Sequence, residues 1–196
     1  MPRPKAYDRA TLVREAMGCF WEMGFRGTSI GELVRRTGVS RHGLYCEFPD
    51  KDALFHACMD TYQAEVVSPA FGQVEAPDAT IAAIVQYFSC QIDRGSERGL
   101  PGPGCLVANT ATELGPHDER ARKLVRRHHD RLRAGFRTAI ANSAPHLTEV
   151  ACDELAEFLV TSAQGLWSFS RTVNHAEPLR RYAHTLMTLI EERLEP

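Results

Sequence analysis

The chain of 196 residues contains no run of 18 apolar residues, so no segment is expected to cross a membrane. No apolar stretch of the signal-peptide kind follows Met1, and a cytoplasmic location is therefore expected. The six cysteines are scattered, without a CxxC pair or any other close pairing. This pattern indicates reduced thiols rather than a disulfide framework or a thiolate metal site.

The sequence also lacks the local motifs of several enzyme classes. No Glu-x-x-His pair predicts a di-metal centre, and no glycine-rich loop predicts a phosphate site. Spacing alone allows a Ser/His/Asp arrangement, but no feature supports one. We therefore expect no catalytic residues, no cofactor and no metal.

Strand-like alternation is missing over any useful length, and the apolar residues follow helical spacing instead. The predicted fold class is all-α. Residues 95–104 hold four glycines and two prolines, which predicts a mobile loop between helices. The expected helices span residues 8–23, 28–37, 41–48, 51–67, 78–94, 105–113, 118–142, 147–173 and 178–194.

Residues 28–51, TSIGELVRRTGVSRHGLYCEFPDK, predict a helix-turn-helix. Thr28 is expected to cap a first helix, Gly38 to end it, and Ser40 to cap a second helix over residues 41–48. Two short helices joined by a turn that contains glycine form the motif whose second helix enters the major groove of DNA.

The same segment closely resembles the N-terminal domain of the TetR family of bacterial transcriptional regulators. The resemblance is specific over about residues 8–56 and departs at His42 and Gly43. It implies an N-terminal three-helix DNA-binding domain (residues 1–52) and a C-terminal helical domain for effector binding and dimerisation (residues 53–196). The matching residues are Thr28, Ser29, Ile30, Leu33, Gly38, Val39, Ser40, Arg41, Leu44, Tyr45, Phe48, Lys51 and Leu54.

Residues of the helix-turn-helix are the candidates for DNA contacts. Arg41, Tyr45 and Lys51 carry donors suited to phosphate oxygens, whereas His42 and Gly43 are expected near base edges. The alternative is that Arg41 and Lys51 are solvated surface charges. The complete predicted DNA-binding set is Thr28, Ser40, Arg41, His42, Gly43, Tyr45 and Lys51.

The charge distribution supports this location. The net charge is −2, but residues 1–45 carry eight basic and four acidic residues, so a basic end precedes an acidic body. The tail at residues 1–9 is a candidate DNA-contacting arm or a loose terminus. The basic run at residues 119–137 is expected to be a solvated outer face, with His128 on its apolar side.

An effector pocket is expected in the C-terminal domain by resemblance to the family. Each aromatic candidate could equally be an ordinary core residue. The candidates are Met59, Tyr62, Tyr87, Phe88, Cys105, Asn109, Phe136 and Trp167.

Gly104-Cys105 resembles a subgroup in which a Gly-Cys begins the sixth helix and some members sense electrophiles or oxidants. A thiol at a helix N-terminus beside a flexible loop suits that chemistry, while a buried structural cysteine is the alternative. A metal-responsive regulator is a further alternative.

The last two predicted helices are too apolar for a solvated monomer. An intramolecular hairpin could bury both of them. The resemblance instead favours a homodimer, whose two reading heads would bind a palindromic operator in double-stranded DNA. The expected function is a dimeric repressor that a small-molecule effector releases from its operator.

Overall fold

A computed structural model describes residues 7–196 of the chain. The described residues contain helices and no strand, which confirms the all-α prediction. The chain divides into two compact units, Met1–Val67 and Ser68–Pro196. Residues 1–6, which include most of the candidate DNA-contacting arm, lie outside the described range.

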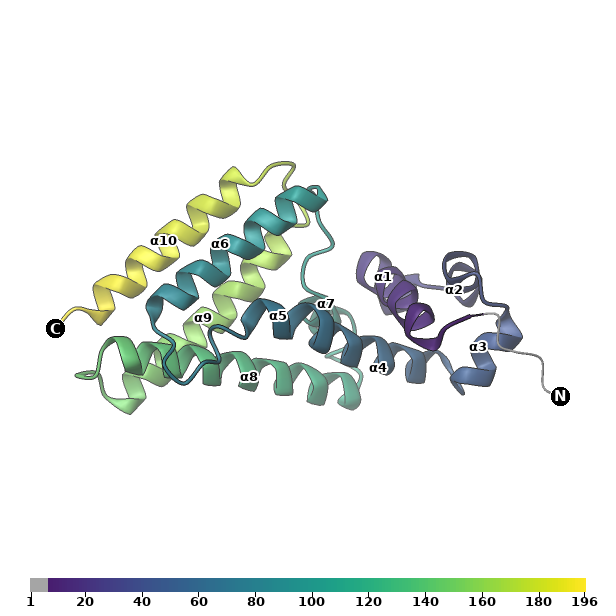
Figure 1. Cartoon of the computed structure of the whole chain (residues 1–196), viewed down its shortest axis with the longest axis horizontal. Helices are drawn as coiled ribbons and strands as arrows, with labels where there is room; N and C mark the ends of the chain where they lie inside the picture. Colours follow the sequence, from purple (N-terminus) through teal and green to yellow (C-terminus); the bar gives the residue numbers. More distant parts are fainter. Residues whose placement is uncertain (1–6) are drawn as a thin grey trace. The chain divides into compact units, whose positions relative to one another are not determined.

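The first unit contains α1 (Arg9–Gly27), α2 (Ile30–Thr37), α3 (Arg41–Glu47), α4 (Lys51–Tyr62) and a π-helical turn, Gln63–Val67 (Figure 1). Its core includes the rings of Phe20, Phe25 and Phe55, whose centroids lie 5.1–6.0 Å apart. Phe55 belongs to α4, so this helix packs with α1. The unit therefore ends at Val67, and the boundary predicted at residues 52/53 is too early.

Local capping explains why α2 and α3 begin and end where they do. Gly38 ends α2 with a φ of 68°, as predicted, and the Ser40 hydroxyl accepts from the Gly43 N–H at the start of α3. The predicted cap at Thr28 is wrong, because Ser29 caps α2 instead. Thr28 is fully buried, and its hydroxyl donates to carbonyl oxygens of α1.

The second unit contains α5 (Ser68–Phe71), α6 (Ile81–Arg98), α7 (Leu106–Glu113), α8 (Glu119–Ser143), α9 (Glu149–Phe169) and α10 (Glu177–Leu194). Helices α8 and α9 pack against each other, and α10 packs on both α6 and α9 (Figure 1). Apolar stripes from these helices fill the core, as amphipathic helices of a bundle do.

The glycine-rich segment at residues 95–104 differs from its prediction. Helix α6 continues to Arg98, so only the residues after it form a connection. The Gly102 N–H donates to the Ser170 carbonyl, and the Asn109 side chain donates to the Pro103 carbonyl. Hydrogen bonds thus anchor the connection that the composition predicts to be mobile.

The basic run at residues 119–137 lies on α8. Several of its arginines pair with carboxylates, including Arg131 with Glu75 and Arg137 with Asp153. His128 is buried on the apolar side, as the spacing predicts. The basic side chains of the run lie on the outer face of α8, as the sequence predicts, and many of them form intramolecular ion pairs there.

Candidate nucleic-acid interface

Helix α3 presents a polar face built from residues one turn apart. Arg41, His42 and Tyr45 are exposed, while Leu44 and the following Phe48 are buried in the core. The Arg41 guanidinium carbon lies 6.0 Å from the centre of the Tyr45 ring. Arg41, Tyr45 and His42 thus share an accessible surface, as three of the predicted DNA contacts require.

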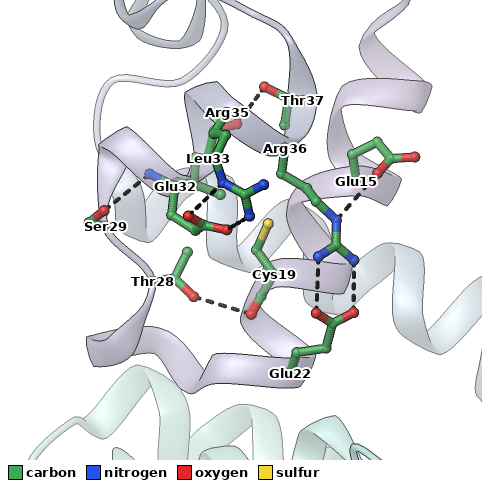
Figure 2. A network of polar contacts seen from close by, with 10 residues as sticks. All are labelled: Glu15, Cys19, Glu22, Thr28, Ser29, Glu32, Leu33, Arg35, Arg36 and Thr37. Carbon is green, nitrogen blue, oxygen red and sulfur yellow. Dashed lines mark hydrogen bonds and ion pairs between the residues drawn. The ribbon is translucent and has the colours of Figure 1, made fainter.

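Most other arginines of this unit are held by carboxylates. Arg36 reaches from α2 to Glu22 and Glu15 on α1 (Figure 2), with its Nη2 2.7 Å from Glu22 Oε1. These hydrogen bonds raise the pKa of the Arg36 guanidinium and lower the pKa of Glu22. Arg35 pairs with Glu32 on the same helix.

Two further pairs reduce the positive charge of the first unit. Arg14 pairs with Glu65, and Arg9 lies 3.6 Å from Glu47 and over the Phe48 ring. Within residues 7–196, Arg41 makes no ion pair with a carboxylate. Among the described residues, Arg41 is therefore a cation of α3 whose charge no carboxylate neutralises.

Lys51, predicted from the sequence as a phosphate contact, is engaged within its own unit. Its ammonium donates to the carbonyl oxygens of Phe25 (2.9 Å) and Thr28 (3.1 Å) and lies 4.2 Å from the centroid of the Phe25 ring. Lysine has three N–H donors, so one remains for another acceptor. Lys51 is first of all a link between the start of α4 and the end of α1.

Close packing inside the domain leaves little room for a side chain at Gly43. A Cβ atom there would lie 2.8 Å from Val39 Cγ1 and 3.4 Å from the ring of Tyr7. The Tyr7 hydroxyl lies 3.2 Å from the Gly43 carbonyl oxygen and donates to it. The absence of a side chain at Gly43 therefore leaves room for neighbouring residues of the same domain. The sequence instead predicted that this glycine allows a close approach to DNA.

The structure also corrects two details of the predicted set. Thr28 is too deeply buried for its hydroxyl to reach a phosphate, and its two carbonyl contacts account for that burial. Tyr7 was missed as a support of α3. Its position 36 residues before Gly43 gives no local signal of the contact.

Four effector candidates meet in the second unit. Tyr87, Phe88, Phe136 and Trp167 form edge and stacked contacts with centroids 5.3–6.5 Å apart. Phe71 of α5, absent from the prediction, lies 5.2 Å from both Tyr87 and Phe136. Burial raises the pKa of the Tyr87 phenol, and nearby Cys105 acts in the same direction.

The other candidates have different places in the fold. Met59 and Tyr62 lie on α4 in the first unit, where Tyr62 packs edge-on against Trp21 with centroids 5.0 Å apart. The Asn109 amide holds the Pro103 carbonyl.

Cys105 occupies the N-cap position of α7 but is only 9% exposed, so the loop does not give its thiol the predicted access. The preceding Gly104 has a φ of 73°, and a Cβ there would lie 2.9 Å from the Trp167 carbonyl oxygen. Close backbone packing therefore accounts for the glycine of the Gly-Cys pair.

Comparison with known proteins agrees with this architecture. Residues 12–58 match the model of "Bacterial regulatory proteins, tetR family", and residues 80–186 match "Tetracyclin repressor-like, C-terminal domain". Both units of the fold are thus covered. The chain belongs to the TetR family. Members of this family are DNA-binding transcription regulators and not enzymes.

Relatives extend over nearly the whole chain. It is 32% identical to the HTH-type transcriptional repressor ComR of Escherichia coli (strain K12), over 97% of this chain and 92% of ComR. A TetR transcriptional regulator from Chloroflexus aurantiacus J-10-FL is 25% identical and superposes with a TM-score of 0.79, covering 93% of each chain.

A cysteine mutant of the TetR family regulator CifR, solved with 26-bp operator DNA, has a TM-score of 0.81 at 24% identity. The match covers 95% of this chain and 98% of that one. At this identity the similarity concerns the fold.

Two further properties concern residues 7–196. No group of three or more His, Cys, Asp or Glu side chains in this range could hold a metal ion. No helix in the same range is long and apolar enough to span a membrane.

Proposed function

We propose that the protein is a dimeric repressor that binds a palindromic operator through α3 and is released by a small apolar effector. The observation that carries the proposal is the exposed face of α3, where Arg41 and Tyr45 lie beside His42. A helix that reads DNA needs side chains that donate hydrogen bonds to phosphate oxygens, next to a side chain that contacts a base edge. The repressor ComR is a relative over almost its full length, which supports repression rather than activation.

Within this face the residues divide into two roles. Arg41 and Tyr45 supply a guanidinium and a phenol to phosphate oxygens, and His42 donates to an acceptor on a base edge. The Ser40 side chain holds the N-terminus of α3 in place. Lys51 contributes by fixing α4 to α1 rather than by contacting a phosphate.

Exposed apolar side chains support dimerisation. Eight large hydrophobic residues are exposed among the described ones, and five of these belong to α9 or α10. A second copy of the same two helices would cover them in a four-helix interface. The five are Val150, Phe158, Phe169, Tyr182 and Leu189.

The aromatic cluster of the second unit, defined as Phe71, Tyr87, Phe88, Phe136 and Trp167, supports an effector site for an apolar molecule. Its rings come from α5, α6, α8 and α9, so a molecule inserted among them would shift several helices at once. An effector that binds one arrangement of those helices more tightly than the other shifts the protein toward that arrangement. The resulting change in DNA affinity is limited by the difference between the effector's affinities for the two arrangements.

The test is fluorescence anisotropy with DNA from immediately upstream of the gene for this protein, against a scrambled duplex, at about 0.15 M salt. Tight binding to the upstream DNA alone, lost in Tyr45→Ala, is the expected result. Tyr45 is 43% exposed, so this variant should fold normally. Equal weak binding to both duplexes would contradict sequence-specific reading of this operator.

A further inference from the structure

A thiol and an imidazole contact each other on the exposed face of α3. The Cys46 sulfur lies 3.5 Å from His42 Nε2, one helical turn away, and both residues are exposed. We propose that this Cys46–His42 pair is a covalent modification site for soft carbon electrophiles of the α,β-unsaturated carbonyl class, and that the adduct blocks DNA binding. The blocking step rests on the proposed role of α3 as the DNA-reading helix.

The other cysteines lack this combination of exposure and a neighbouring base. Cys19, Cys58, Cys105 and Cys152 are buried. Burial raises the pKa values of the Cys19 and Cys58 thiols, which keeps them protonated and unreactive.

Cys90 on α6 is exposed like Cys46, but it has no imidazole partner among residues 7–196. The chain therefore contains its own matched control, a second exposed thiol without a histidine.

The geometry suits thiol addition. With the His42 ring neutral and protonated on Nδ1, its Nε2 accepts the Cys46 thiol proton. The sulfur electron pair forms a bond to the β-carbon of the electrophile, the carbon–carbon π bond breaks, and an enolate results. The imidazolium returns the proton to the α-carbon. The net reaction is an addition that consumes no oxidant or reductant.

The position of the adduct explains its effect. Side chains at i and i+4 lie on the same helix face, so a group on Cys46 lies beside His42, the predicted base contact. The major groove, about 12 Å wide, admits one helix with little room for additional atoms. An adduct on this face therefore prevents α3 from entering the groove.

The first experiment measures reactivity without DNA. The full-length protein is treated with limiting N-ethylmaleimide at pH 7, and the adducts at Cys46 and Cys90 are followed by peptide mass spectrometry. We expect Cys46 to react about tenfold faster than Cys90, because an adjacent general base accelerates proton removal.

The His42→Gln variant should lower the Cys46 rate to that of Cys90, whereas Cys90→Ser should leave it unchanged. Circular dichroism checks that His42→Gln folds. Equal rates at the two cysteines in the original sequence, or a Cys46 rate that His42→Gln does not change, would overturn the proposed pair.

The second experiment compares operator affinity before and after complete alkylation of the exposed thiols, each variant against its own untreated sample. The original sequence and Cys90→Ser should lose at least about tenfold in affinity, while Cys46→Ser should lose nothing. Undiminished binding by the alkylated original protein overturns the blocking step. If the untreated protein binds no operator, the proposed function and the blocking step are both overturned. The alkylation rates of the first experiment still decide in that case whether the Cys46–His42 pair is reactive.

Discussion

Lys51 Nζ lies 2.9 Å from the carbonyl oxygen of Phe25 and 4.2 Å from the centroid of the same residue's ring. One ammonium therefore satisfies a carbonyl at the end of α1 and lies on an aromatic face. The contact ties α4, which follows the helix-turn-helix of α2 and α3, to α1, which precedes it.

This contact predicts that Lys51→Met lowers the free energy of unfolding by about 1–2 kcal/mol, since the carbonyls of Phe25 and Thr28 lose a charged donor. Urea unfolding measures the loss. The dependence of operator affinity on salt should change little. If Lys51→Met instead left the stability unaltered and removed one phosphate contact from the salt dependence, Lys51 would have the phosphate-binding role that the sequence predicts.

Arg41 should behave in the opposite way. It is exposed and makes no ion pair within residues 7–196, so Arg41→Ala should change stability by no more than about 0.5 kcal/mol. Removing one phosphate contact should reduce the slope of log K against log salt by about 0.9. Anisotropy titrations at several salt concentrations measure it, and an unchanged slope would contradict a phosphate contact by Arg41.

Gly43→Ala tests the packing beneath α3. Alanine normally stabilises a helix relative to glycine, but the added Cβ would lie 2.8 Å from Val39 Cγ1. We expect the clash to dominate and to lower the free energy of unfolding by about 1–2 kcal/mol. Val39→Ala removes the clashing atom, so the double variant should be more stable than the sum of the two single losses predicts. Strict additivity would show that Val39 does not set the cost.

His128 predicts a pH dependence of stability. Burial, together with smaller effects of His129 and Arg131 nearby, lowers its pKa to about 4. In the unfolded chain the imidazole binds a proton near pH 6.5, whereas in the folded chain it does so only near pH 4. Protonation therefore favours the unfolded chain, and the free energy of unfolding decreases as the pH falls through this range. Above pH 6.5 the contribution is complete, and below pH 4 no further loss arises from this group.

The measurement is urea unfolding at pH 7.5, 6, 5 and 4, compared between the original sequence and His128→Gln. The original should lose up to about 3 kcal/mol more than the variant over the full interval. His129, whose pKa is also lowered by burial, remains in both proteins and contributes a shared background. Parallel profiles would contradict the assignment to His128.

The proposed dimer predicts a defined response to charge on its apolar surface. Phe158→Glu and Leu189→Glu place carboxylates on residues that are 47% and 49% exposed, so the single chain should still fold. Both variants should be monomeric in analytical ultracentrifugation and should bind the operator weakly. Val85→Glu, on α6 and 37% exposed, is the matched control and should remain dimeric. Dimers in all three variants would place the interface elsewhere.

Local chemistry in the sequence was sufficient for much of the reading head. Gly38 and Ser40 act on their immediate neighbours, so the end of α2 and the start of α3 follow from residue type and spacing. The apolar spacing of α8 likewise placed His128 on the buried side. These features depend on backbone groups a few residues away, and the sequence alone determined them, together with the all-α class.

Only the tertiary structure decided what the charged and polar side chains contact. Lys51 finds carbonyls 23 and 26 residues earlier, and Tyr7 reaches Gly43 across 36 residues. The burial of Cys105 and the packing of α4 with α1 are equally non-local. A pattern of helical spacing states which face of a helix is apolar, but not which helix covers it. Partners far apart in the sequence meet only when the helices pack, and so the fold determined these roles.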